Sequence, residues 1–97
     1  MALRVLLAVL ALVASGCGPV LYTSHLRSAE QKLDQARDEN ARWYAPYEYY
    51  FAEAHLDQAR EEAAQAQYED AVRYADVAEQ WSERALAITQ RSRQADR

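Results

Sequence analysis

Apolar and small residues recur along this chain at alternating steps of four and three residues, a spacing that keeps side chains on one face of an α-helix. The faces between these stripes carry charged residues and Gln, as in an amphipathic helix. From Val20 onward the only helix-breaking residue is Pro46. The three stripes are Tyr22, Leu26, Ala29, Leu33, Ala36, Asn40 and Trp43; Tyr49, Ala52, Leu56, Ala59, Ala63 and Ala66; and Tyr68, Ala71, Ala75, Ala78, Ser82 and Ala85. We therefore expect an all-α fold, either a small antiparallel bundle of three helices with an alanine-rich seam or a helical hairpin with a long last arm.

The chain carries signals for where the helices begin. Thr23 or Ser24 can cap the first helix, because a side-chain oxygen at that position accepts a hydrogen bond from a first-turn amide. Proline is tolerated in a first turn, so Pro46 places the start of the second helix near Ala45.

The boundary between the second and third helices is marked only by register. The segment 65–68 (QAQY) contains no Gly or Pro, so a continuous helix over 46–91 would also satisfy local propensity. The two-residue step from Ala66 to Tyr68 breaks the rhythm of threes and fours, which favours two separate helices.

An internal repeat accompanies the stripes. Residues 29–36 read AEQKLDQA, residues 52–59 read AEAHLDQA, and residues 78–85 read AEQWSERA. The first two copies both continue with Arg, so the string LDQAR occurs twice. This period suggests one helix and one turn per unit. Chance similarity in an Ala- and Glu-rich chain is the alternative, above all for the third copy.

The first seventeen residues have the layout of a secretory signal peptide. Arg4 supplies a positive charge, residues 5–13 form an unbroken apolar run, and residues 14–16 are small. Cys17 follows directly, and this arrangement resembles the lipobox of bacterial lipoproteins. The resemblance implies that the Cys17 thiol is acylated and that the signal is removed.

Cleavage between Gly16 and Cys17 would make the cysteine the new N-terminus. Even the longer stretch 3–13, which includes Arg4, has only eleven residues, short of the roughly 20 apolar residues that a membrane-spanning helix needs. An uncleaved N-terminal anchor, or a cytoplasmic chain with an apolar start, is the alternative interpretation.

The segment that follows the cleavage site is acidic. It has 81 residues, and the loss of Arg4 leaves 10 basic against 15 acidic side chains, a net charge of −5. This charge does not suit nucleic acid, whose phosphates favour clustered Lys and Arg. Cys17 is the only cysteine, so no disulfide within the chain can stabilise the domain.

The middle of the chain is similar to the domain-of-unknown-function-4398 family. The matching residues are Ala45, Pro46, Tyr49, Ala52, Leu56 and Ala59, preceded by Ala36, Ala41 and Tyr44 and followed by Tyr68, Ala71, Ala75 and Ala78. The similarity covers residues 26–88. It implies a short Ala-rich helical domain of the kind found in bacterial lipoproteins, sometimes beside outer-membrane, peptidoglycan-binding domains, with no catalytic residues to carry over. The family usually has Leu in place of Tyr49 and Gly-Asp in place of Ala66-Gln67.

Six aromatic residues lie within nine positions around Pro46. Tyr and Trp present an apolar body with a polar tip, which suits contact with a partner, a glycan or a lipid headgroup. Helical geometry places Tyr49 on the alanine stripe and the others elsewhere, so some rings should be exposed. The candidate partner surface is Trp43, Tyr44, Tyr47, Tyr50 and Phe51. The alternative is that these rings fill the first turn of the bundle.

Other polar residues give weaker signals. His25 and His55 lie on different expected helices, and their spacing does not predict a metal site. Nothing resembles a nucleophile with its base, so we expect no enzymatic activity and no cofactor. The C-terminal arginines are Arg84, Arg91, Arg93 and Arg97. They can contact lipid phosphates or an acidic polymer, or they can complement the end of a helix.

These features divide the chain into a signal peptide (1–16), a lipidated N-terminus with a short linker (17–23), a helical domain (24–91) and a polar tail (92–97). We expect a lipoprotein of the outer membrane that faces the periplasm, because Gly18 stands where lipoproteins retained at the inner membrane of enterobacteria carry Asp. The expected function is that of a structural or adaptor protein, whose surface binds an envelope protein or a second copy of this chain. No nucleic acid or small-molecule substrate is expected. The alternatives are a cell-wall or lipid-headgroup binding module and an oligomeric coiled-coil spacer.

Overall fold

Five helices account for nearly all of the chain in the computed structural model, which describes residues 1–15 and 17–97. Gly16, on one side of the expected cleavage site, lies outside the described residues. The helices are α1 (Ala2–Ser15), α2 (Cys17–Asp38), α3 (Ala41–Tyr44), α4 (Pro46–Ala64) and α5 (Tyr68–Ala95). The expected all-α fold is confirmed, and the observed form is a bundle.

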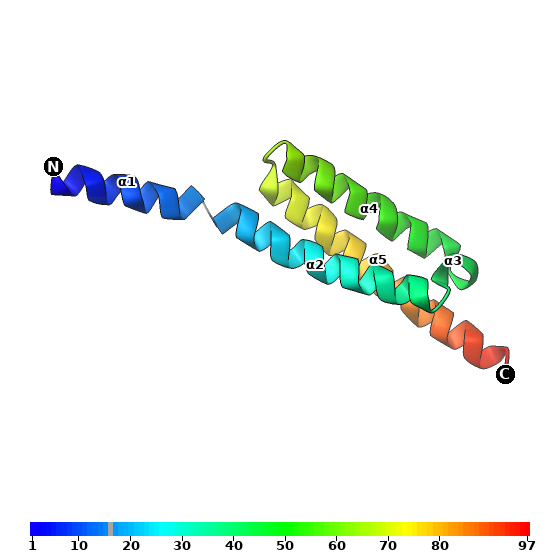
Figure 1. The fold of residues 1–97 in the computed structure, drawn as a ribbon. Coiled ribbons are helices and arrows are strands. Elements are labelled where there is room, and N and C mark those ends of the chain that lie inside the picture. Colours follow the sequence, from blue (N-terminus) through cyan, green and yellow to red (C-terminus); the bar gives the residue numbers. More distant parts are fainter. Residues whose placement is uncertain (16) are drawn as a thin grey trace.

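The bundle consists of α2, α4 and α5 (Figure 1). The helix α4 runs back along α2, and α5 returns parallel to α2, so that polar contacts between α2 and α5 recur at a separation of 51 positions, as in His25–Asp76 and Ser28–Glu79. Both α2 and α4 pack mainly on α5 and meet each other less closely. Among the described elements α1 contacts only α2. No helix of the described residues is long and apolar enough to cross a membrane.

The bundle has two different ends. The proximal end, where α2 begins at Cys17, also holds the turn between α4 and α5. The distal end holds α3 and the last turns of α5, which continue past the neighbouring helices to the C-terminus (Figure 1). Chain entry and chain exit therefore lie at opposite ends.

The core is a seam of small side chains, because alanine lets helix backbones approach closely. Its buried members are Ala29, Leu33, Ala36, Ala41, Ala45, Tyr49, Ala52, Leu56, Ala59, Ala71, Ala75, Ala78, Ser82, Ala85 and Thr89. Most of the second and third stripes is confirmed as buried, and so is the middle of the first stripe, Ala29 to Ala36. The hydroxyls of Ser82 and Thr89 each donate a hydrogen bond to the backbone carbonyl four residues earlier, which explains why polar residues are accepted there.

The first stripe ends earlier than its pattern predicts. Its continuation through Asn40 and Trp43 is wrong, since α2 ends at Asp38 and Trp43 is 77% exposed. Asn40 has a φ of 71°, a left-handed conformation that Asn tolerates better than most residues. Its carbonyl accepts the first hydrogen bonds of the short helix α3. The chain then leaves the helical conformation at Ala45 (φ −141°, ψ 59°), since the α region is disfavoured before a proline, and Pro46 starts α4 as predicted.

The start of α2 also differs from the prediction. Thr23 and Ser24 do not cap this helix, because it already begins at Cys17. The Thr23 hydroxyl instead donates to the carbonyl of Pro19 at 2.8 Å, within the helix. Pro19 is tolerated because a proline in the first turn removes an amide that has no helical partner.

The predicted break between the second and third helices is confirmed, and the alternative of one continuous helix over 46–91 is wrong. The amide of Gln67 bonds to the carbonyl of Glu62 at 2.9 Å, and that of Ala66 bonds to Ala63 at 2.9 Å. This is the hydrogen-bond pattern of a Schellman motif, which satisfies the last carbonyls of α4. The motif requires a left-handed residue, and here that residue is Ala66, with a φ of 58°.

Replacing Ala66 with glycine should stabilise the bundle. A left-handed conformation strains an alanine but not a glycine, so Ala66→Gly should raise the free energy of unfolding by about 1 kcal/mol. The matched control is Ala54→Gly at an exposed position inside α4, which should lower it by about 1 kcal/mol. Urea titrations of the two variants measure both changes. The same sign for both would contradict the assigned turn.

Candidate functional site

The two best-matched copies of the internal repeat face each other across the α2–α4 seam. Because α2 and α4 are antiparallel, the copies are related by an approximate two-fold axis across the helices. They line a groove of about 290 Å³ with four equivalent pairs: Glu30 and Glu53, Leu33 and Leu56, Asp34 and Asp57, and Arg37 and Arg60. This constellation gives the repeat a structural role, which the spacing alone did not reveal.

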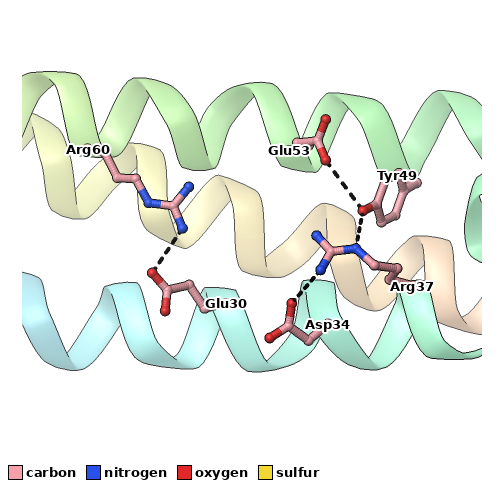
Figure 2. A network of polar contacts seen from close by, with 6 residues as sticks. All are labelled: Glu30, Asp34, Arg37, Tyr49, Glu53 and Arg60. Carbon is pink, nitrogen blue, oxygen red and sulfur yellow. Dashed lines mark hydrogen bonds and ion pairs between the residues drawn. The ribbon is translucent and has the colours of Figure 1, made fainter.

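Polar contacts close this groove at both ends (Figure 2). Arg60 donates to Glu30 across the seam at 3.0 Å and to Asp57 on its own helix at 3.2 Å. Its counterpart Arg37 donates to Asp34 at 3.0 Å, again on its own helix. The equivalent of the Arg60–Glu30 contact would join Arg37 to Glu53.

A tyrosine stands between Arg37 and Glu53. Arg37 Nε donates to the Tyr49 hydroxyl at 2.9 Å, and that hydroxyl donates to Glu53 at 3.4 Å. In the other copy of the repeat, the position of Tyr49 is held by Leu26, which has no polar atom. The symmetry is therefore broken by Tyr49, which is also a position where this chain departs from the family pattern.

Tyr49 combines burial with a polar contact. Its residue surface is fully buried, and its ring lies edge-on to Tyr50 and 5.4 Å from the guanidinium of Arg42. The hydrogen bond to Tyr49 raises the pKa of Arg37 above its ordinary value, so this guanidinium stays charged. Within the described residues no buried side-chain polar atom lacks a hydrogen-bond partner. The groove is therefore a satisfied seam that holds α2 to α4.

The candidate partner surface divides into two parts. Three of its rings are exposed at the distal end, namely Trp43 at 77%, Tyr47 at 65% and Tyr50 at 52%. The other two, Tyr44 and Phe51, are half-buried. Tyr49 faces the core, as helical geometry predicts.

Sequence reasoning missed an aromatic row that continues from Tyr47 along the α4–α5 seam. Phe51 lies between Trp81 and His55, with ring centroids 4.3 and 4.2 Å away. The row extends from His55 to Tyr74 at 6.0 Å. The signal was the spacing of Tyr47, Phe51 and His55 by four residues, combined with Trp81 in the third copy of the repeat.

The middle of the row, Phe51 and Trp81, is packing between helices, because these rings lie against other side chains. Phe51 contacts rings on both sides, and the guanidinium of Arg84 lies 4.6 Å from the Trp81 ring centroid. Stacking against a sugar or a base needs a free ring face. The rings that remain open to a partner are the three exposed ones at the distal end.

The remaining candidates take part in contacts within the chain. His25 pairs with Asp76 at 2.5 Å, and His55 Nδ1 lies 2.9 Å from the carbonyl of Phe51. The structure does not bring the two histidines together with other ligands, and no group that could hold a metal ion is found in the described part of the chain. Among the C-terminal arginines, Arg93 pairs with Glu39 at 3.8 Å.

Removing only the Tyr49 hydroxyl should weaken the seam. Tyr49→Phe leaves the ring in the core but removes the hydrogen bonds to Arg37 and Glu53, so it should cost about 0.5–1.5 kcal/mol. Tyr50→Phe is the matched control at an exposed ring, and it should change the free energy of unfolding by less than about 0.5 kcal/mol. Chemical denaturation measures both. Equal effects of the two substitutions would show that the hydroxyl does not stabilise the fold.

Comparisons with known proteins identify the family of this domain. Neither the curated proteins nor the solved structures give a match to this chain. The family described as Domain of unknown function (DUF4398) matches residues 24–97, which include most of α2 and all of α3, α4 and α5. The chain therefore belongs to the DUF4398 family.

Proposed function

We propose that this protein is a lipid-anchored component of a bacterial envelope, in which the bundle presents an adaptor surface to another envelope protein or to a second copy. The observation that carries this proposal is the separation of Cys17 from the exposed rings. Cys17 begins α2 at the proximal end, and Trp43, Tyr47 and Tyr50 lie beyond or near its last turn at the distal end. The proposal assigns no catalytic residue.

The packing of α1 supports its removal as a signal peptide. This helix touches only α2 among the described elements. Large apolar side chains such as Leu3, Leu6 and Leu10 are between 65% and 69% exposed. Cleavage between Gly16 and Cys17 would remove this apolar surface without taking contacts from α4 or α5.

The length of α2 favours the adaptor function over the alternative of a module that binds lipid headgroups. The 22 residues of this helix rise by about 33 Å. When the bundle points away from the membrane, rings at the distal end would be too far from the lipidated residue to reach the headgroups of the same membrane. This arrangement favours a protein partner in the periplasm, and the choice of the outer membrane for the anchor rests on Gly18. The coiled-coil spacer is disfavoured because α4 and α5 are separate helices.

Substitution of Cys17 tests the anchor. Cys17→Ala removes the thiol that would be acylated, so the protein should leave the membrane fraction or keep its Met1 terminus. The readouts are membrane fractionation and the mass of the N-terminal peptide after labelling with a palmitate analogue. Thr23→Ala is the control, because it changes an exposed side chain nearby and should leave both readouts unchanged. Wild-type protein that carries an intact Met1 and no lipid would refute the proposal.

The exposed rings provide the test of the adaptor surface. Tyr50→Ala should spare the fold and weaken association, since aromatic anchors commonly contribute 2 kcal/mol or more at interfaces, roughly thirtyfold in affinity. Quantitative co-purification from envelope extracts and sedimentation of the purified protein distinguish a different partner from a second copy. Gln67→Ala, an exposed change at the proximal end, is the control. An unchanged yield with Tyr50→Ala, or an early thermal transition, would contradict this role.

A further inference from the structure

The proximal end of the bundle is formed largely by two segments that contain no charged residue. Residues 18–24 and 63–68 contain no Asp, Glu, Lys or Arg, although these make up 27% of the chain. Val20 is 71% exposed and Leu21 is 54% exposed. Between the first turns of α2 and α5 lies a notch of about 280 Å³, lined by Gly18, Leu21, Tyr68 and Val72 together with Glu69 and Arg73. An apolar surface with charged side chains at its border therefore adjoins Cys17.

We propose that this proximal end is a membrane-seating surface, which rests in the headgroup–acyl boundary of the bilayer to which Cys17 is anchored. The inference rests on the proposed lipidation and adds an orientation, in which the bundle stands on its end. The occupant of the surface is a lipid layer, because the surface adjoins the acylated residue and its apolar side chains would otherwise face water.

The start of α2 makes this orientation rigid. The helix begins at Cys17, so no flexible linker separates the lipid from the bundle. A Cβ added at Gly18 would lie only 3.4 Å from Tyr68, which shows how closely the first turn of α2 approaches that of α5. The lipid would therefore place the seating surface against the bilayer without reorganising the fold.

Two tyrosines at the proximal end are suited to the headgroup–acyl boundary of a bilayer. Tyr22 and Tyr68 lie side by side, with ring centroids 6.2 Å apart. Burial raises the pKa of the Tyr22 phenol, and the nearby guanidinium of Arg60 opposes that rise. Tyrosine is enriched at the membrane–water boundary, where its ring is shielded from water and its hydroxyl stays hydrated.

Carboxylates near the proximal end of the bundle limit how deeply this end can enter the bilayer. Glu61 and Glu62 precede the turn, and Glu69 and Asp70 follow Tyr68. Asp70 is paired with Arg73, and the others leave a net negative charge close to the seating surface. Because charged groups are costly in hydrocarbon, these side chains stay in the headgroup layer and favour a zwitterionic surface over an anionic one.

Tryptophan fluorescence can measure the orientation in the full lipidated protein. The vesicles contain phosphatidylethanolamine and phosphatidylcholine with brominated acyl chains, which quench only nearby indoles. Wild-type protein has Trp81, opposite residue 30 and about 20 Å along α2 from Cys17, and Trp43, at about 33 Å. The tryptophan emission of the wild-type protein should be the same in brominated and in plain vesicles. Leu21→Trp places an indole one turn from Cys17, and the added emission should be largely lost.

A second added indole provides the control, and mass spectrometry separates the two proposals. Ala54→Trp puts an exposed indole on α4 toward the distal end, so its emission should not be quenched. Quenching of the wild type or of Ala54→Trp would mean that the bundle lies on its side, which overturns the seating. Equal emission of Leu21→Trp in brominated and plain vesicles, with the lipid confirmed by mass, would also overturn it. An unacylated Cys17 would instead overturn the proposed function itself.

Discussion

The close approach of three helices along an alanine seam is the constraint on which the rest of this structure depends. With Ala29, Ala52 and Ala78 at the contacts, the backbones can pack tightly, but each methyl group buries little apolar area. Among the residues whose burial the structure describes, Leu33 and Leu56, each 3% exposed, are the only buried aliphatic residues larger than alanine. The specificity of the packing therefore comes from what flanks the seam, namely the polar groove between α2 and α4 and the aromatic row between α4 and α5.

Periodicity predicted most of the fold because each helix buries only one narrow face. The stripe from Tyr49 to Ala59 could be read residue by residue, and the start of α4 followed from the fixed φ of Pro46. The end of α2 could not be predicted in this way, because Asn40 and Trp43 continue the spacing of the first stripe while the backbone turns at Asn40. The turn at Ala66 had only a register signal, since its left-handed residue is not a glycine.

Contacts between helices were harder to predict than the helices themselves. The LDQAR repeat was visible, yet the pairing of its two copies depends on α2 and α4 lying antiparallel, which no single helix determines. The exposure of Tyr47 and Tyr50 followed from the helical wheel, whereas the stripe pattern had placed Trp43 on the buried face. The covered faces of Phe51 and Trp81 did not follow from the helical wheel, because Trp81 comes from the third copy of the repeat, 30 residues away. Tyr49 shows the same limit, since its hydroxyl has a role only in relation to Arg37 on another helix.

The odd number of passes through the bundle has a mechanical consequence. The chain enters at Cys17 at one end and leaves from α5 at the other, and the 28 residues of α5 span about 42 Å. A force that pulls the two ends apart would slide α2 and α5 past each other along their length. Their contacts, from Tyr22–Tyr68 to Lys32–Glu83, would then resist together in shear, whereas a helical hairpin pulled at its two adjacent ends would separate one turn at a time.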